Sequence, residues 1–245
     1  MKLSNIIENE YSNVTQKDTL LEQYQKNNQD NKNGLLFSLW NKCNEQFTLF
    51  DLNALELERD NITRIINQPN LREISPQEIT SFCVDLANHQ NDPFFECAGS
   101  FLSCIINIHH MQTKYAEKYF IPVFQLNTPL RLLCDNNTAN VEVEGSVKSY
   151  FCNMMKSGIV TLNGNCKNFV GNEMSGGTMY INGNAEDNLG NEMSGGTIYV
   201  AGNVGEHAGS KLSNGSIHIK GNYKSLAYYI PMGKVYHLGK RIVPP

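Results

Sequence analysis

The sequence predicts an α+β chain in two parts, an N-terminal α-helical domain followed by a right-handed parallel β-helix, which is a single-stranded solenoid with 19-residue coils. Three observations support this fold class. Glycine recurs every 19 residues at Gly145, Gly164, Gly183, Gly202 and Gly221. The segments before these glycines alternate apolar and polar residues, as β-strands do. Finally, 15 of the 19 glycines lie within 145–221, whereas all eight prolines lie outside it.

Residues 1–138 are assigned to the helical domain. Its opening part, residues 1–34, is polar, so we expect a short helix over Thr19–Gln25 and otherwise a loose segment. Residues 36–68 carry apolar residues at helical spacing and stop before Pro69, which indicates one or two helices.

Two further helices have clear start signals. Ser75, Pro76 and Glu78 form a capping-box pattern, which predicts a helix that runs to about Gln90. Asp92 and Pro93 open the next helix, which is expected to end near residue 112. Apolar residues surround most of its circumference, so it is predicted to be the central buried helix of the domain.

Residues 139–225 are assigned to the β-helix. Equivalent strands 19 residues apart should lie parallel and in register, about 4.8 Å from one another. Five sets of apolar residues then point inward: Val160, Met179, Ile198 and Ile217; Leu162, Ile181, Val200 and Ile219; Met155, Met174, Met193 and Leu212; Cys166, Ala185 and Val204; Val170, Leu189 and Ala208.

Glycine is expected at the corners of each coil, where the chain takes a positive φ or one backbone approaches another. The asparagine after each corner glycine tolerates left-handed conformations and can hydrogen-bond to its copy in the next coil. The structural glycines are Gly164, Gly183, Gly202, Gly205, Gly209 and Gly221.

Gly202, Gly205 and Gly209 satisfy the pattern G-x-x-G-x-x-x-G. Residues 141–225 resemble the repeat domain that carries this pattern in the C-terminal part of the glutamate synthase large subunit and in one of the subunits of formylmethanofuran dehydrogenase. The other coils depart from the pattern at its middle glycine, and Cys152 stands where the first coil should carry glycine. The resemblance implies a β-helix that is a structural and interface element, with catalytic groups elsewhere.

One outward column of the predicted sheet is aromatic. Tyr180, Tyr199 and His218 are 19 residues apart, so their side chains should stack as a ridge. Such a ridge could bind a partner protein, because tyrosine offers rigid apolar area with a polar tip. Stacking on a sugar ring is the weaker alternative. A third alternative is that the tyrosines are ordinary strand residues covered by the N-terminal domain, with no binding role.

Catalysis has only weak candidates. Cys97 or Cys104 with His109 or His110 could form a nucleophile and its base, since a thiolate needs a nearby imidazole or a helix N-terminus. Cys104 and His109 are five positions apart, which places them on different faces of a helix. The pattern therefore favours packing, and no catalytic residue is predicted.

Composition excludes several other functions. The net charge of -4 comes without a basic stripe, which disfavours nucleic acid as a partner. The chain has no run of 18 apolar residues and its first residues lack a signal-peptide core, so we expect no membrane insertion and a cytoplasmic location at synthesis, with secretion by another route left open. The seven cysteines include no C-x-x-C pair, and neither a metal nor a cofactor is predicted.

These observations predict a non-catalytic scaffold or protein-interaction module that binds another protein or associates with itself. The alternatives are an accessory structural subunit of an oxidoreductase or of an amide- or formyl-transferring complex, as the resemblance implies, and an enzyme with its site at the domain junction. Residues 226–245 have the apolar content to cap the last coil. An uncovered end would expose unpaired strand edges.

Overall fold

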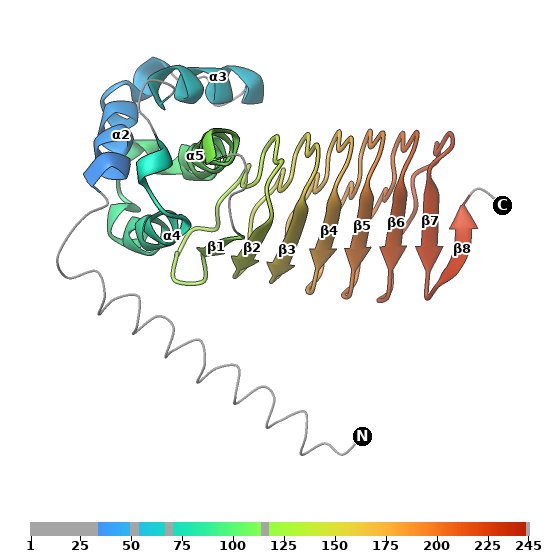
Figure 1. Cartoon of the computed structure of the whole chain (residues 1–245). Coiled ribbons are helices and arrows are strands. Elements are labelled where there is room, and N and C mark those ends of the chain that lie inside the picture. Colours follow the sequence, from blue (N-terminus) through green and yellow to red (C-terminus); the bar gives the residue numbers. More distant parts are fainter. Residues whose placement is uncertain (1–33, 50–53, 67–70, 114–117, 244–245) are drawn as a thin grey trace, which may run out of the picture.

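The computed structural model describes residues 34–49, 54–66, 71–113 and 118–243, and it shows a helical domain at one end of a row of parallel strands (Figure 1). The helix expected over Thr19–Gln25 lies outside these residues. The two-part fold class is confirmed, with a β-solenoid of about six turns.

Four α-helices and four short 3₁₀ turns form the described part of the helical domain. The α-helices are α2 Gly34–Glu45, α3 Leu55–Ile66, α4 Pro76–Asp85 and α5 Ala98–Thr113. The turns are η1 Phe47–Leu49, η2 Leu71–Glu73, η3 Leu86–His89 and η4 Pro93–Cys97. The capping box at α4 is confirmed, because Ser75 accepts from the Glu78 amide and the Glu78 carboxylate accepts from the Ser75 amide.

The helical core is built around aromatic side chains from distant parts of the sequence. The Trp40 ring centroid lies 4.8 Å from that of Phe94 and 5.4 Å from that of Phe101, in edge-on arrangements that aromatic rings favour. The Trp40 indole donates to Asp92 Oδ2 at 2.9 Å. Asp92 makes no side-chain cap at η4, and its carboxylate contributes instead to the core.

Eight strands follow one another in a single sheet, in the order of the sequence. β1 to β7 pair in parallel and β8 pairs antiparallel with β7. The strands are β1 Tyr119–Pro122, β2 Val141–Glu144, β3 Ile159–Asn163, β4 Thr178–Ile181, β5 Thr197–Val200, β6 Ser216–Ile219, β7 Lys234–His237 and β8 Lys240–Val243.

The inward columns expected from the sequence are confirmed, since every side chain in the five sets is buried. Val160, Met179, Ile198 and Ile217 pair in register from β3 to β6. A second line of pairing runs through isolated bridges on another side of each coil, from Val147 through Cys166, Ala185 and Val204 to Tyr223. The solenoid core is therefore a stack of equivalent apolar residues.

The sheet is longer than the range 139–225 assigned from the sequence. It begins at Tyr119, whose partner Val141 lies 22 residues later, so the first coil does not follow the 19-residue period. It also continues into the predicted capping tail, where β7 adds a strand 18 residues after β6. Irregular first and last coils escape a search for one fixed period.

The helical domain covers the outer edge of β1 (Figure 1). From α4, Thr80 Oγ1 donates to the Phe120 carbonyl at 2.7 Å, and Cys83 Sγ donates to the Pro122 carbonyl at 3.2 Å. Edge-strand carbonyls that would otherwise be open to another strand are thus satisfied within the chain.

Candidate functional site

The outward side chains of β4 to β7 form one row, which we call the aromatic ridge and which consists of Tyr180, Tyr199, His218 and Tyr236. Successive ring centroids are 5.1, 4.6 and 4.5 Å apart, and successive ring planes meet at 9°, 24° and 4°. The geometry follows from the register, because parallel strands hold equivalent side chains at the strand spacing.

Tyr236 was missed by the sequence analysis. The last coil is one residue short, so the 19-residue step from His218 arrives at His237, whose backbone is paired with Ile219. The signal that could have found Tyr236 is local. Gly233-Lys-Val-Tyr repeats the glycine, outward, inward, outward pattern of Gly215-Ser-Ile-His.

Stacking decides which parts of the rings a ligand can reach. The faces of Tyr199 and His218 are turned toward the neighbouring rings, so the ridge presents ring edges and polar tips to solvent. Tyr180 is the most open member, with 41% of its surface exposed. A sugar ring stacks on an aromatic face, whereas a protein surface can pack across a row of edges.

His218 lies between two tyrosine rings of the ridge, Tyr199 and Tyr236. Its Nε2 is 3.2 Å from Ser216 Oγ, and burial lowers the pKa of the imidazole from its ordinary value. At neutral pH the ring is therefore neutral, and the ridge combines three phenols with a neutral imidazole. This chemistry suits a partner surface that is apolar with hydrogen-bonding groups.

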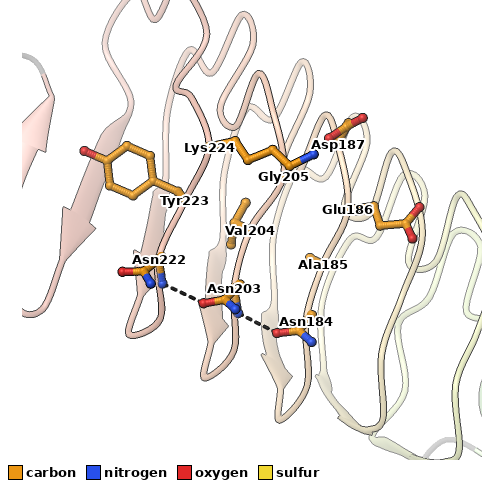
Figure 2. Close-up of a pocket in the computed structure, with 10 residues that line it drawn as sticks. All are labelled: Asn184, Ala185, Glu186, Asp187, Asn203, Val204, Gly205, Asn222, Tyr223 and Lys224. Atoms are coloured by element: carbon orange, nitrogen blue, oxygen red, sulfur yellow. Dashed lines mark hydrogen bonds between the residues drawn. The ribbon is translucent and has the colours of Figure 1, made fainter.

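A groove of about 540 Å³ crosses three coils on another side of the solenoid (Figure 2). Its base is formed by Ala185, Val204 and Gly205, and an asparagine ladder runs along one side of it. In this ladder the backbone N–H of each asparagine donates to the side-chain Oδ1 of the asparagine one coil earlier: Asn203 to Asn184 at 2.7 Å and Asn222 to Asn203 at 2.8 Å.

Gly205 explains why the groove is hollow. Lys167, Glu186 and Lys224 occupy the equivalent position in other coils, and Lys167 forms an ion pair with Glu186. At Gly205 a Cβ would lie 2.2 Å from Asp187 Oδ1, which accepts from the Glu206 amide at 2.7 Å. The Cβ would also lie 2.8 Å from the Glu186 carbonyl carbon and 2.9 Å from the Asp187 nitrogen, so the backbone of the preceding coil leaves no room for a side chain, and the groove follows from this.

The other structural glycines serve two geometric needs. A Cβ at Gly164, Gly183 or Gly221 would lie 2.2 to 2.3 Å from the corner carbonyl of the preceding coil, and one at Gly202 would lie 2.4 Å from Asn184 Oδ1. Gly209 instead has a φ of +75°. Cys152, in the position equivalent to Gly171, has a φ of 54° and takes the same left-handed conformation with a side chain.

The two cysteine candidates are buried in the helical domain. Burial raises the pKa of the Cys104 thiol to about 12 and raises that of Cys97 well above its ordinary value. Cys104 Sγ lies 3.5 Å from Thr63 Oγ1. Within the described residues no hydrogen bond joins either sulfur to a histidine, so neither cysteine has the base that a nucleophile needs.

The histidine candidates have different surroundings. His109 is fixed between Tyr119 Oη, 2.7 Å from its Nδ1, and the Ile74 carbonyl, 2.9 Å from its Nε2. Burial lowers the pKa of this imidazole. His110 Nδ1 is buried and has no partner among the described residues. The structure brings neither histidine together with Cys97 or Cys104.

The domain junction contains charged residues that the sequence analysis did not single out. Glu58 of α3 is fully buried, and its carboxylate accepts from Ser100 Oγ at 2.5 Å and pairs with Arg131. Arg59 Nη1 lies 3.5 Å from Asp135 Oδ2, and Asn153 Nδ2 donates to Asp135 Oδ1 at 2.7 Å. Helix-spaced charges on α3 gave no signal of burial in the sequence.

That junction is a continuous polar connection between the two domains. From Asp135 a second ladder, the amide ladder, runs into the solenoid through the side-chain amides of Asn153, Asn172 and Asn191. In it, Asn172 Nδ2 donates to Asn153 Oδ1 at 2.8 Å and Asn191 Nδ2 donates to Asn172 Oδ1 at 2.7 Å. Burial raises the pKa of Asp135, although its hydrogen bonds from Asn153 and Arg59 act in the opposite direction. Each of these four charged side chains is paired with another group at the junction. The junction therefore holds the two domains together through buried polar contacts.

Within the described ranges, no group of three His, Cys, Asp or Glu side chains could hold a metal ion. None of the helices in those ranges is long and apolar enough to cross a membrane. Neither the protein-family models nor the curated proteins compared with this sequence match it.

Proposed function

We propose that this chain is a non-catalytic scaffold or interaction module whose β-solenoid binds a partner protein through the aromatic ridge. The observation that carries the proposal is the in-register stack of Tyr180, Tyr199, His218 and Tyr236. Rings that are already ordered by their neighbours lose little conformational freedom when a partner packs on them. Aromatic residues are also the side chains that contribute most to protein interfaces.

The chemistry of the ridge favours a protein over a sugar. The inner ring faces are occupied by other rings, and the accessible groups are ring edges, phenol oxygens and one neutral imidazole. A partner surface with apolar side chains and backbone hydrogen-bonding groups complements this arrangement.

The burial and raised pKa values of Cys97 and Cys104 support a non-catalytic role over an enzyme with its site at the junction. The accessory-subunit function rests on the resemblance to the glutamate synthase repeat domain. Gly202, Gly205 and Gly209 each have a geometric reason in this solenoid, so the motif itself does not favour that narrower function. It is tested by asking whether the partner is a large catalytic subunit.

The test is affinity purification of the tagged full chain from its own cells. The double variant Tyr180→Ala/Tyr199→Ala should lose the proteins that the wild type retains, while its thermal unfolding stays close to the wild type. The matched control is Tyr150→Ala/Phe169→Ala, which removes another stacked pair, with ring centroids 5.1 Å apart, from a different side of the coil. Identical sets of retained proteins for the ridge variant and the wild type would refute the ridge as the interface.

A further inference from the structure

The C-terminal end of the solenoid, around the segment between β6 and β7, exposes apolar and aromatic side chains. Tyr228 is fully exposed, and Tyr229 and Met232 have 61% and 73% of their surface exposed. The backbone of this segment is ordered on the preceding coil, since the Lys211 amide donates to the Tyr229 carbonyl at 2.9 Å and the Gly233 amide donates to the Leu212 carbonyl at 3.0 Å. These side chains project from a fixed support.

The same end is basic in an otherwise acidic chain. Residues 207–243 contain six basic and no acidic residues, although the whole chain has a net charge of -4. All six basic side chains are exposed: Lys211, Lys220, Lys224, Lys234, Lys240 and Arg241. Lys211 forms an ion pair with Glu192 of the preceding coil. The positive charge at this end complements an acidic partner.

The end also has an open backbone edge. In the preceding coils Asn165, Asn184 and Asn203 each accept, through Oδ1, an amide N–H from the following coil. Asn222 Oδ1 accepts no such bond within the described residues, and neither the Tyr223 amide nor the Tyr223 carbonyl has a backbone partner there. The chain turns back at Leu238 and Gly239 into β8, so among the described residues no further coil lies over Asn222–Lys224.

The two ends of the solenoid are therefore treated differently. At the first strand, Thr80 and Cys83 of α4 donate to the edge carbonyls. At the last strand, the edge of β8 carries Lys240 and Arg241, charges of the kind that deter pairing between identical edges. The edge at Asn222–Lys224 carries Lys224, and the His237 ring packs edge-on against Tyr223 with ring centroids 5.1 Å apart. The Tyr223 amide and carbonyl nevertheless have no backbone partner among the described residues.

We infer that an extended acidic segment of another protein binds here, adding one parallel rung over Asn222–Lys224. Its amide N–H groups would continue the ladder at Asn222 Oδ1 and the edge at Tyr223, as strand addition does at other sheet edges. Acidic side chains would lie near Lys220 and Lys224, and apolar side chains near Tyr228 and Met232. This surface is separate from the aromatic ridge, and the inference does not depend on the proposed function.

The test measures fluorescence anisotropy of the full chain with a labelled, end-blocked peptide, NVEVEV, which repeats the asparagine-apolar pattern of the corner. The peptide begins at the position over Asn222, because β7 already pairs with β6 before Gly221. We expect saturable binding that weakens as salt increases. The peptide PVEVEV lacks the N–H that would meet Asn222 Oδ1, so it should bind about 2- to 10-fold more weakly, the range for one hydrogen bond. Asn222→Ala should weaken the asparagine peptide similarly and abolish the difference between the two peptides.

Two further variants test whether binding depends on positive charge at this end and whether it involves the aromatic ridge. Lys224→Glu should weaken binding of the acidic peptide, and Tyr199→Ala should leave it unchanged. Asn222 and Lys224 are exposed, so neither substitution disturbs the core.

Equal binding of the basic peptide NVKVKV, or no difference between the asparagine and proline peptides on the wild type, would overturn the inference. Tighter binding of duplex DNA or of phosphatidylserine vesicles would also overturn it, because the end would then be a general cationic surface. The same holds for self-association of the chain through this end that the acidic peptide fails to reverse.

Discussion

The helical domain and the solenoid are stabilised by contacts of different range. In the helical domain, Trp40 meets Phe94, Phe101 and the Asp92 carboxylate, all more than 50 residues away in the sequence. In the solenoid, backbone and side-chain contacts join residues about one coil apart, such as Asn184 with Asn203 and Tyr180 with Tyr199. The helical domain is thus one cooperative core, whereas the solenoid is a chain of nearest-neighbour interfaces.

The junction combines both kinds of contact. Its ion pairs join residues far apart in the sequence, whereas the amide ladder that leaves it joins residues one coil apart. Damage there should affect both domains, and damage within one coil should stay local.

The largest effect is expected at the buried ion pair. Arg131→Met leaves the fully buried Glu58 carboxylate without its cation, which should lower the free energy of unfolding by about 3–5 kcal/mol in urea titrations. Lys167→Met removes an exposed ion pair with Glu186 and should cost less than about 1 kcal/mol. The double variant Glu58→Met/Arg131→Met should regain most of the loss. Equal losses of unfolding free energy for Arg131→Met and Lys167→Met would show that the buried ion pair matters no more than the exposed one.

A smaller effect is expected from glycine substitutions. Gly190 has a φ of +65° and its Cβ would lie 2.6 Å from Ile217 Cδ1, so Gly190→Ala should cost about 1–3 kcal/mol in thermal unfolding experiments. Gly34, at the first residue of α2, has no atom within 4 Å of its Cβ position, and Gly34→Ala should not destabilise the protein. If Gly190→Ala leaves the stability unchanged, the corner can adjust to a side chain. That result would contradict the view that neighbouring coils fix the corner conformation.

The smallest effect is a change of pH dependence at Asp135. Burial raises the pKa of this carboxyl in the folded state above its unfolded value, so its contribution to stability is full at low pH and is lost as pH rises through the folded pKa. Asp135→Asn removes that titration, and the stability of the variant relative to the wild type should increase with pH in urea titrations. Parallel curves for the two proteins would show that the carboxyl has no raised pKa.

The sequence predicted the periodic features best. The inward columns, the bridge through Cys166, Ala185 and Val204, and the α4 capping box follow from local pattern, and the structure contains them. In each case the residue and its partner are repeats of one unit or lie within one turn of helix. The stack of Tyr180, Tyr199 and His218 has the same origin.

The features that were missed depend on irregular coils or on distant partners. Tyr119 and Tyr236 lie in coils of different length, so a fixed step passes over them. The pair of Glu58 and Arg131 joins residues 73 positions apart, and neither residue carries a local mark of burial.

The sequence by itself determined the winding of the solenoid and the direction of its side chains, because each coil is its neighbour's template and equal spacing places equal residues at equal positions. Only the tertiary structure decided how the two ends differ, with α4 donating to the carbonyls of β1 and the Tyr223 amide and carbonyl left without a backbone partner within the described residues. That choice depends on where a separate domain packs and where the chain turns back, and non-repeating contacts between distant segments set both.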